Sequence, residues 1–212
     1  MSRRRSLKRA ENRRSPKARF VVFCEGRNTE PQYIQALERK LQGTIIEVEI
    51  IGGAGTPATI AGKAIDSLRL VARKKKKQSF EKNDQVWAVF DHDEHPEVAQ
   101  SIQRCRDAGV GIAYSNPCFE LWLILHKEAY DRACDRHQVQ KHLETLCPEY
   151  DCDSGKSADC SKLIENLDQA EERANVQLAR RAEEGSVLGC PCTTVQEFTQ
   201  ALRAAHASYK AE

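Results

Sequence analysis

The sequence predicts an α/β fold, with a mainly parallel sheet flanked by helices. Three observations support this prediction: short apolar runs that suit buried strands, a helical period after each run, and Gly or Pro at the joins between them. Four strand and helix units in succession are typical of a parallel sheet covered on both faces. Beyond residue 126 the pattern is mostly helical, so a helical C-terminal extension is also expected. The strands are expected at residues 20–24, 45–51, 86–90 and 111–114.

Helix starts are predicted from residue types that cap a first turn. Thr29 and Gln32 have the spacing of a capping box, and Thr194 and Glu197 repeat it near the C-terminus. Asn116 follows the fourth predicted strand and is expected to cap the next helix. These residues set the expected starts of three helices.

Length and composition limit the class of protein. With 212 residues, of which 40% are hydrophobic and 30% charged, the chain suits one domain or a domain with an appendage. No run approaches the roughly 18 apolar residues of a membrane span. The basic N-terminus also lacks the apolar region of a secretory signal. We therefore expect a cytoplasmic protein that makes no membrane contact.

Charge is divided unevenly along the chain. The first 19 residues hold nine Lys and Arg residues against Glu11, which leaves 24 basic and 30 acidic side chains, or a balance of −6, for the rest. Residues 1–18 are therefore predicted to form a basic, disordered tail. Such a tail favours a polyanion such as nucleic acid, although a role in solubility fits the composition equally well.

Nine cysteines raise the question of zinc binding. Their odd number, without a secretory signal, argues against a disulfide framework. No CxxC pair is present, whereas structural zinc sites normally use short, regular ligand pairs. Zinc is therefore disfavoured but stays an alternative, for which the candidate ligands are Cys147, Cys152, Cys160, Cys190 and Cys192.

Carboxylates stand where two of the predicted strands end. Glu25 follows the first strand, and Asp91 and Asp93 follow the third. Ligands of such sheets bind at the carboxyl ends of the strands, so the three acids meet at one crevice if these strands are neighbours. Like charges repel at close range unless a cation intervenes, and Mg²⁺ or Mn²⁺ binds carboxylate oxygens. A metal site is predicted; alternatively, the two aspartates only cap the following helix.

Four other polar residues near these strand ends are candidates for the site. Glu120 lies on an otherwise apolar helix, where a carboxylate should be paired or bound, so it is a candidate fourth acid. Asn116 lies at the same edge of the sheet. His126 could bind phosphate when protonated or only complement the helix dipole, and Arg27 could contact substrate or simply be solvated.

The chain resembles the RloB family of bacterial proteins. The resemblance rests on three segments in this order and spacing: VVFCEGRNTEPQYIQAL, VFDHDEHP and SNPCFELWLILH. The core of that family is similar to the Toprim fold of topoisomerases, primases and overcoming-lysogenization-defect nucleases. The resemblance implies a Toprim-like, or Rossmann-like, core at residues 19–126 and a helical extension at 127–212 packed on it.

The resemblance also implies an activity. Carried over to this sequence, the Toprim pattern makes Glu25 a metal ligand or general acid/base and makes Asp91 and Asp93 ligands of Mg²⁺. Lys156 lies where a lysine recurs in the family and could neutralise a scissile phosphate or be an ordinary loop residue. A chain of this length lacks the DNA-handling domains of a topoisomerase. The expected reaction is therefore metal-dependent hydrolysis of DNA or RNA, with Glu120 as a further catalytic acid.

The biological setting follows from the same resemblance. Genes of the family are associated with restriction-modification and other anti-phage loci, which implies a defence effector that acts on nucleic acid and works with a defence-system ATPase. Two alternatives stay open. The acidic cluster could hold a structural ion or a nucleotide in a non-catalytic sensor or partner subunit, or the protein could be a nucleotidyl transferase. ATP binding is not expected, because no GxxxxGK[ST] loop is present.

Overall fold

A computed structural model gives the fold of most of the chain. Several predictions concern residues that it does not describe: the basic tail apart from Ala18, the metal ligand Asp93, the cysteine Cys152 and the lysine Lys156. The described residues are 18–41, 46–75, 84–92, 97–150 and 158–210.

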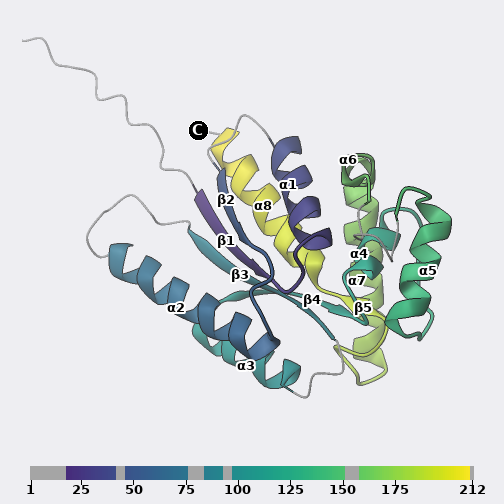
Figure 1. The fold of residues 1–212 in the computed structure, drawn as a ribbon, viewed down its shortest axis with the longest axis horizontal. Helices are drawn as coiled ribbons and strands as arrows, with labels where there is room; N and C mark the ends of the chain where they lie inside the picture. Colours follow the sequence, from purple (N-terminus) through teal and green to yellow (C-terminus); the bar gives the residue numbers. More distant parts are fainter. Residues whose placement is uncertain (1–17, 42–45, 76–83, 93–96, 151–157, 211–212) are drawn as a thin grey trace, which may run out of the picture.

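A five-stranded sheet forms the middle layer of the protein (Figure 1), and its strand order is β2-β1-β3-β4-β5. The first four strands in the chain are mutually parallel, and β5 pairs with β4 in the antiparallel direction. The predicted α/β fold with a mainly parallel sheet is confirmed. A fifth strand was not expected. The strands are β1 (Ala18–Cys24), β2 (Ile46–Ile51), β3 (Gln85–Asp91), β4 (Gly111–Asn116) and β5 (Cys192–Thr193).

Helices cover both faces of the sheet, because side chains alternate between the faces along each strand. On β1, Phe20 and Val22 belong to one apolar cluster, whereas Val21 and Phe23 belong to the other. The first cluster is covered by α1 (Thr29–Lys40), α4 (Glu120–Leu125) and α8 (Val195–Lys210), and the second by α2 (Pro57–Lys75) and α3 (Val98–Ala108). None of the described helices is long and apolar enough to cross a membrane.

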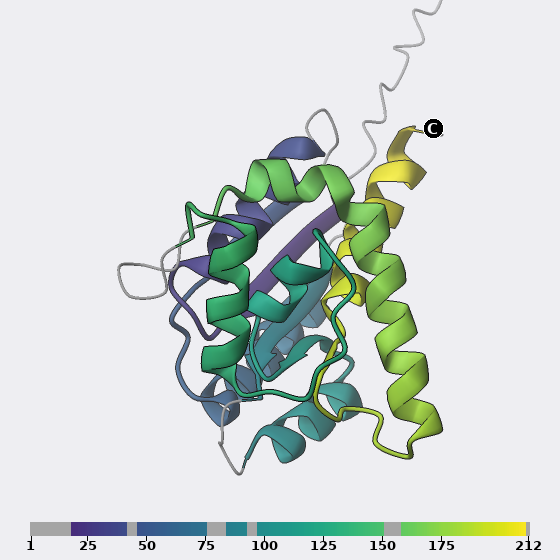
Figure 2. The ribbon, with the colours of Figure 1, turned by 90° about the vertical axis from the view of Figure 1, so that its right-hand side faces the viewer.

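The C-terminal half shares the core of the N-terminal half. Helix α4 contacts α5 on one side and α7 on the other (Figure 2). Phe198 of α8 packs edge to face against Phe20 of β1 and Trp87 of β3, with ring centroids 6.4 and 5.3 Å apart. The remaining helical segments are α5 (Arg136–Leu146), α6 (Cys160–Leu163), the 3₁₀ turn η1 (Ile164–Asn166) and α7 (Leu167–Glu183).

Two of the predicted helix starts are wrong. Asn28, not Thr29, precedes the first turn of α1, so Thr29 is already a helical residue. Asn116 does not cap a helix but ends β4, and its Nδ2 donates a hydrogen bond to the carbonyl of Leu188 (3.0 Å). Helix α4 begins only at Glu120.

The Thr194 side chain also differs from its predicted capping role. Its hydroxyl accepts a hydrogen bond from the backbone N–H of Tyr114 (2.9 Å) and donates one to the carbonyl of Ile112 (3.3 Å), which ties the start of α8 to β4. A capping box is formed at α5 instead. There Asp135 accepts from the Gln138 backbone N–H (2.9 Å), and the Gln138 side chain accepts from the Asp135 N–H (3.2 Å).

Candidate functional site

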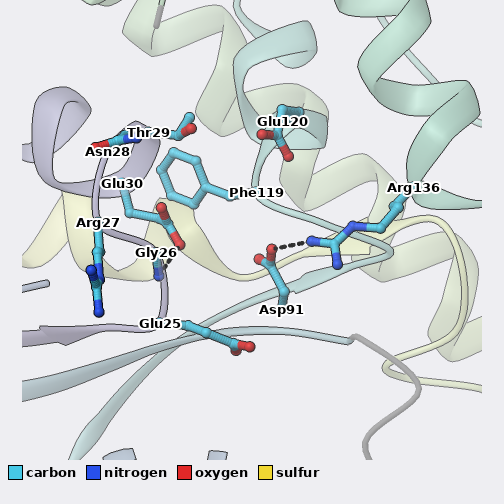
Figure 3. A pocket seen from close by; sticks show the side chains of 10 residues that line it. All are labelled: Glu25, Gly26, Arg27, Asn28, Thr29, Glu30, Asp91, Phe119, Glu120 and Arg136. Atoms are coloured by element: carbon cyan, nitrogen blue, oxygen red, sulfur yellow. Dashed lines mark hydrogen bonds and ion pairs between the residues drawn. The ribbon is translucent and has the colours of Figure 1, made fainter. Parts of the chain in front are cut away.

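A pocket of about 220 Å³ lies at the carboxyl ends of β1 and β3 (Figure 3). These strands are neighbours, with Cys24 of β1 in register with Val89 of β3. The chain passes from β1 to β2 on one side and reaches β3 on the other, so the pocket lies at the topological switch point where α/β sheets bind ligands. Glu25 directly follows β1, and Asp91 is the last residue of β3. The strand-end reasoning is therefore confirmed for Glu25 and Asp91.

Asp91 occupies the middle of the pocket wall (Figure 3) and is 8% exposed. Its Oδ2 lies 3.5 Å from Nη2 of Arg136, whereas its buried Oδ1 has no hydrogen-bond partner among the described residues. Burial raises the pKa of Asp91 well above its usual value, and the nearby carboxylates of Glu30, Glu120 and Glu25 raise it further. Arg136 opposes this rise. The ionised form of Asp91 is therefore costly without a closer cation.

The segment from Glu25 to Glu30, which runs from the end of β1 into the first turn of α1, forms another part of the pocket wall. The Glu30 carboxylate, which is buried, accepts a hydrogen bond from the backbone N–H of Gly26 (3.0 Å). A Cβ at residue 26 would lie only 2.1 Å from Oε2 of Glu30, so the close approach of the carboxylate requires glycine here. Arg27 lines the pocket and is exposed, and its side chain passes over Gly53.

Glu120 comes from the first turn of α4 and is 3% exposed. The hydroxyl of Tyr150 donates a hydrogen bond to its Oε1 (2.8 Å). The sequence argument that so buried a carboxylate must be paired is therefore confirmed. The pocket carboxylates also affect two neighbouring thiols. The pKa of Cys118 is raised by burial and then by Glu120, and the pKa of Cys24 is raised by burial and then by Glu30.

Two predicted site residues lie elsewhere. Asn116 does not line the pocket, since its side chain bonds Leu188. His126 is 1% exposed, lies 3.0 Å from the Tyr33 hydroxyl, and packs against the rings of Tyr33 and Trp122. Burial lowers the pKa of His126 to about 3. The predicted phosphate contact through His126 is therefore wrong, because its side chain is enclosed in the core and does not line the pocket.

Comparison with known proteins decides the family. The profile of a family described as RloB-like protein matches residues 20–202, which is most of the chain. The chain belongs to the RloB-like family. The match confirms the family recognised from the three sequence segments. No curated protein and no solved structure matches the chain.

Two charged residues of the RloB-like pocket, Glu30 and Arg136, were not predicted. Glu30 lies in the first turn of α1, where an acidic residue is common because it complements the helix dipole, so its type gave no signal. Arg136 is 45 residues from Asp91 in sequence and belongs to a helix assigned to the extension. Its position at the start of a helix, where a cation is disfavoured, was the available clue.

The RloB-like pocket suits a hard divalent cation better than zinc. Its donors are carboxylate oxygens, and the buried Oδ1 of Asp91 has no partner among the described residues. Within the part of the chain that the structure describes, no three His, Cys, Asp or Glu side chains are close enough to bind one ion. Mg²⁺ is commonly held by only one or two carboxylates together with waters and substrate phosphates. The donor set therefore fits Mg²⁺ or Mn²⁺.

Proposed function

We propose that this RloB-like protein is a Mg²⁺-dependent nuclease with a Toprim-like core, which hydrolyses phosphodiester bonds of DNA or RNA in anti-phage defence. The observation that carries the proposal is the buried, partly unsatisfied Asp91 beside Glu25 at a switch point of a parallel sheet. Buried carboxylates in such a crevice are costly unless they serve binding or chemistry. Nucleic acid as substrate and a defence-system ATPase as partner belong to the same proposal.

Asp91 and Glu25 are the described residues that would hold the ion, together with Asp93. When bound, the ion supplies neutralisation of phosphate charge and activation of a water molecule. Glu25, which directly follows β1, moves the proton of the attacking water. Glu120 is held in place by Tyr150 and keeps the pocket acidic on the α4 side.

The cationic residues have a separate role in the proposal. Arg27 is exposed at the pocket, where it contacts the phosphate backbone of the substrate. Lys156 keeps its proposed role of neutralising the scissile phosphate. The basic tail adds a contact that is independent of sequence and sensitive to salt.

The proposal is tested by incubating the full chain with single-stranded DNA, double-stranded DNA and total tRNA in Mg²⁺, Mn²⁺ or EDTA. Cleavage that requires the metal and falls about 100-fold or more in Asp91→Asn supports it, because the ion contributes several kcal/mol to the transition state. Asp66→Asn is the matched control, since Asp66 is an exposed acid on α2. Cleavage that continues in EDTA or in Asp91→Asn would contradict the proposal.

One observation favours the alternative of a non-catalytic sensor or partner subunit. Arg136 already lies within ion-pair distance of Asp91, so the aspartate has a protein counter-ion. In that alternative, a divalent cation raises the thermal stability of the protein, but no nucleic acid is cleaved with any metal. Thermal unfolding and the cleavage assay, performed on the same preparation, therefore separate the two functions.

A further inference from the structure

Cys134 and Cys190 differ from the other described cysteines in their exposure. Eight cysteines lie in the part of the chain that the structure describes, and all have free thiols; six are buried, whereas these two are partly exposed. They are 56 residues apart in sequence, yet the Cys190 thiol donates a hydrogen bond to the backbone carbonyl of Cys134 (3.3 Å). The two described cysteines that an oxidant in solution reaches most easily are therefore also neighbours.

Helix α7 fixes the two segments that carry these cysteines. The buried guanidinium of Arg181 donates a hydrogen bond to the carbonyl of Cys190 (3.1 Å) and lies 3.1 Å from a carboxylate oxygen of Asp131. The buried side chain of Gln177 donates a hydrogen bond to the carbonyl of Tyr130. Asp131 and Tyr130 belong to the segment that leads to the first cysteine. Buried side chains of one helix therefore hold both segments, so the cysteine pair is part of the fold.

The local geometry suits a bond between the two sulfurs. The Cys190 thiol contacts a backbone atom of Cys134 itself, so the two backbones are already close, and rotation of the side chains can bring the sulfurs together. The Tyr130 hydroxyl lies 3.1 Å from Sγ of Cys134. Burial raises the pKa of Cys134, and the hydrogen bond with Tyr130 opposes this rise. The thiolate of Cys134 is therefore a minor form at pH 7, and we expect a slow reaction.

We propose that the fold holds Cys134 and Cys190 in position for an intramolecular disulfide bond, which hydrogen peroxide forms. The thiolate of one cysteine attacks a peroxide oxygen, the O–O bond breaks, and the hydroxide that leaves takes up the proton released by that thiol. The second thiolate attacks the resulting sulfenic sulfur and displaces hydroxide, which takes up the second proton. Two thiols and one peroxide thus give one disulfide and two water molecules.

The disulfide joins one wall of the acidic pocket to the edge of the sheet. Cys134 directly precedes Asp135, which caps α5, and the next residue, Arg136, lines the pocket. Cys190 lies two residues before Cys192 of β5, the strand that pairs with the end of β4. Oxidation therefore tethers the start of α5 to the segment before β5. The inference does not depend on the proposed function, because the bond is measured without any cleavage of nucleic acid.

Peptide mapping of the full chain tests the bond directly. The reduced protein is treated with hydrogen peroxide, its remaining thiols are alkylated after unfolding, and it is digested with trypsin without reduction. Cys134 is the only cysteine of the tryptic peptide 133–136, whereas Cys190 and Cys192 share the peptide 182–203. We expect the two peptides to be joined and to separate in dithiothreitol. A Cys134 peptide that is alkylated, or that is joined to any other peptide or to a second chain, would overturn the proposal.

Three variants identify the thiols that react. Cys134→Ser and Cys190→Ser should lose the cross-link between the peptides. Cys192→Ala is the matched control and should keep it, because the Cys192 side chain is fully buried. A cross-link that persists in Cys190→Ser, or that is lost in folded Cys192→Ala, would assign the bond to Cys192 and overturn the proposed pair.

Thermal unfolding of the same samples tests whether the folded chain holds the pair in position. A bond across 56 residues restricts the unfolded chain, so the oxidised wild type should melt about 5 °C higher than the reduced protein. The rise should disappear in dithiothreitol and be absent from Cys134→Ser and Cys190→Ser. If the cross-linked wild type melts at an unchanged or lower temperature, joining the sulfurs distorts the fold, and the proposed arrangement is wrong.

Discussion

Two clusters of buried polar groups lie side by side at one end of the sheet, and they differ in how fully their hydrogen bonds are satisfied. At the end of β4, the hydroxyl groups of Ser115 and Thr193 form a hydrogen bond with each other (3.0 Å). The Thr194 hydroxyl accepts a hydrogen bond from the backbone N–H of Tyr114 and donates one to the carbonyl of Ile112. At the end of β3, the buried carboxyl group of Asp91 has an oxygen, Oδ1, without a hydrogen-bond partner among the described residues. The first arrangement stabilises the fold, whereas the second is the kind that proteins keep for function.

The largest expected effect separates activity from stability at Asp91. Asp91→Asn should reduce metal-dependent cleavage about 100-fold or more, while the free energy of unfolding without divalent ions stays the same or rises, because a buried carboxyl group whose ionisation is unfavourable is replaced by a neutral amide. Initial rates and urea unfolding measure the two quantities. If the Asp91→Asn variant is less stable than the wild type but still cleaves, the role of Asp91 is structural, as at the end of β4.

The reverse result is expected at the end of β4. Thr194→Val keeps the side-chain shape but removes two hydrogen bonds and leaves the Tyr114 N–H buried, so the free energy of unfolding should fall by about 1–3 kcal/mol. Cleavage per folded molecule should stay at the wild-type level. Thr145→Val, at an exposed position on α5, is the matched control and should change stability by less than about 0.5 kcal/mol. A loss of cleavage in folded Thr194→Val would show that the cluster at the end of β4 also serves the activity.

A third test concerns His126, a buried residue that bonds the Tyr33 hydroxyl and lies away from the pocket. The unfolded state binds a proton at His126 below a pKa of about 6.5, whereas the folded state does so only near a pKa of about 3. The folded protein should therefore lose about 2 kcal/mol of stability through this residue as the pH falls from 7 to 5.

The pH dependence of urea unfolding should be shallower in His126→Gln than in the wild type. His137→Gln is the control, because His137 is exposed on the neighbouring helix and its replacement should preserve the wild-type slope. Equal slopes in the wild type and His126→Gln would mean that His126 is not buried in its neutral form.

The smallest effects are expected at two glycines, and they have opposite signs. Gly26→Ala forces the Glu30 carboxylate to move, so cleavage should fall about tenfold with a stability loss of about 1 kcal/mol. Gly62→Ala, in the interior of α2 with no atom within 4 Å of the new Cβ, should raise stability by about 0.5–1 kcal/mol and leave cleavage unchanged. If Gly26→Ala cleaves normally, the position of Glu30 does not matter for the site.

The fold was largely predictable because its strands are buried on both faces. Such strands are continuous apolar runs, and the polar residue that ends each run marks the carboxyl end of the strand. This logic located Glu25 and Asp91. The strand β5 could not be detected, because a strand of two residues shows no periodicity. The role of Asn116 was predicted wrongly, because an Asn at this position suits a helix cap and a strand end equally well.

The site was only partly predictable, because its charged residues come from segments that are far apart in the sequence: Asp91, Glu120 and Arg136 join the segment from Glu25 to Glu30. Arg136 reaches Asp91 because α5 packs against α4, and no local pattern reports that packing. The predicted phosphate contact of His126 was wrong for the same reason. Its position at a helix end suggested a charge role, but Tyr33 and Trp122 enclose it and make the neutral form the stable one.

The contact of Phe198 with Phe20 and Trp87 has a consequence for synthesis on the ribosome. The strands β1 and β3 are translated long before α8, so the part of their apolar face that Phe198 covers stays open until residue 198 has emerged. The nascent chain therefore carries an incomplete core, which favours aggregation and chaperone binding over folding. Because the pocket lies at the ends of these two strands, its supporting core is complete only after α8 has emerged.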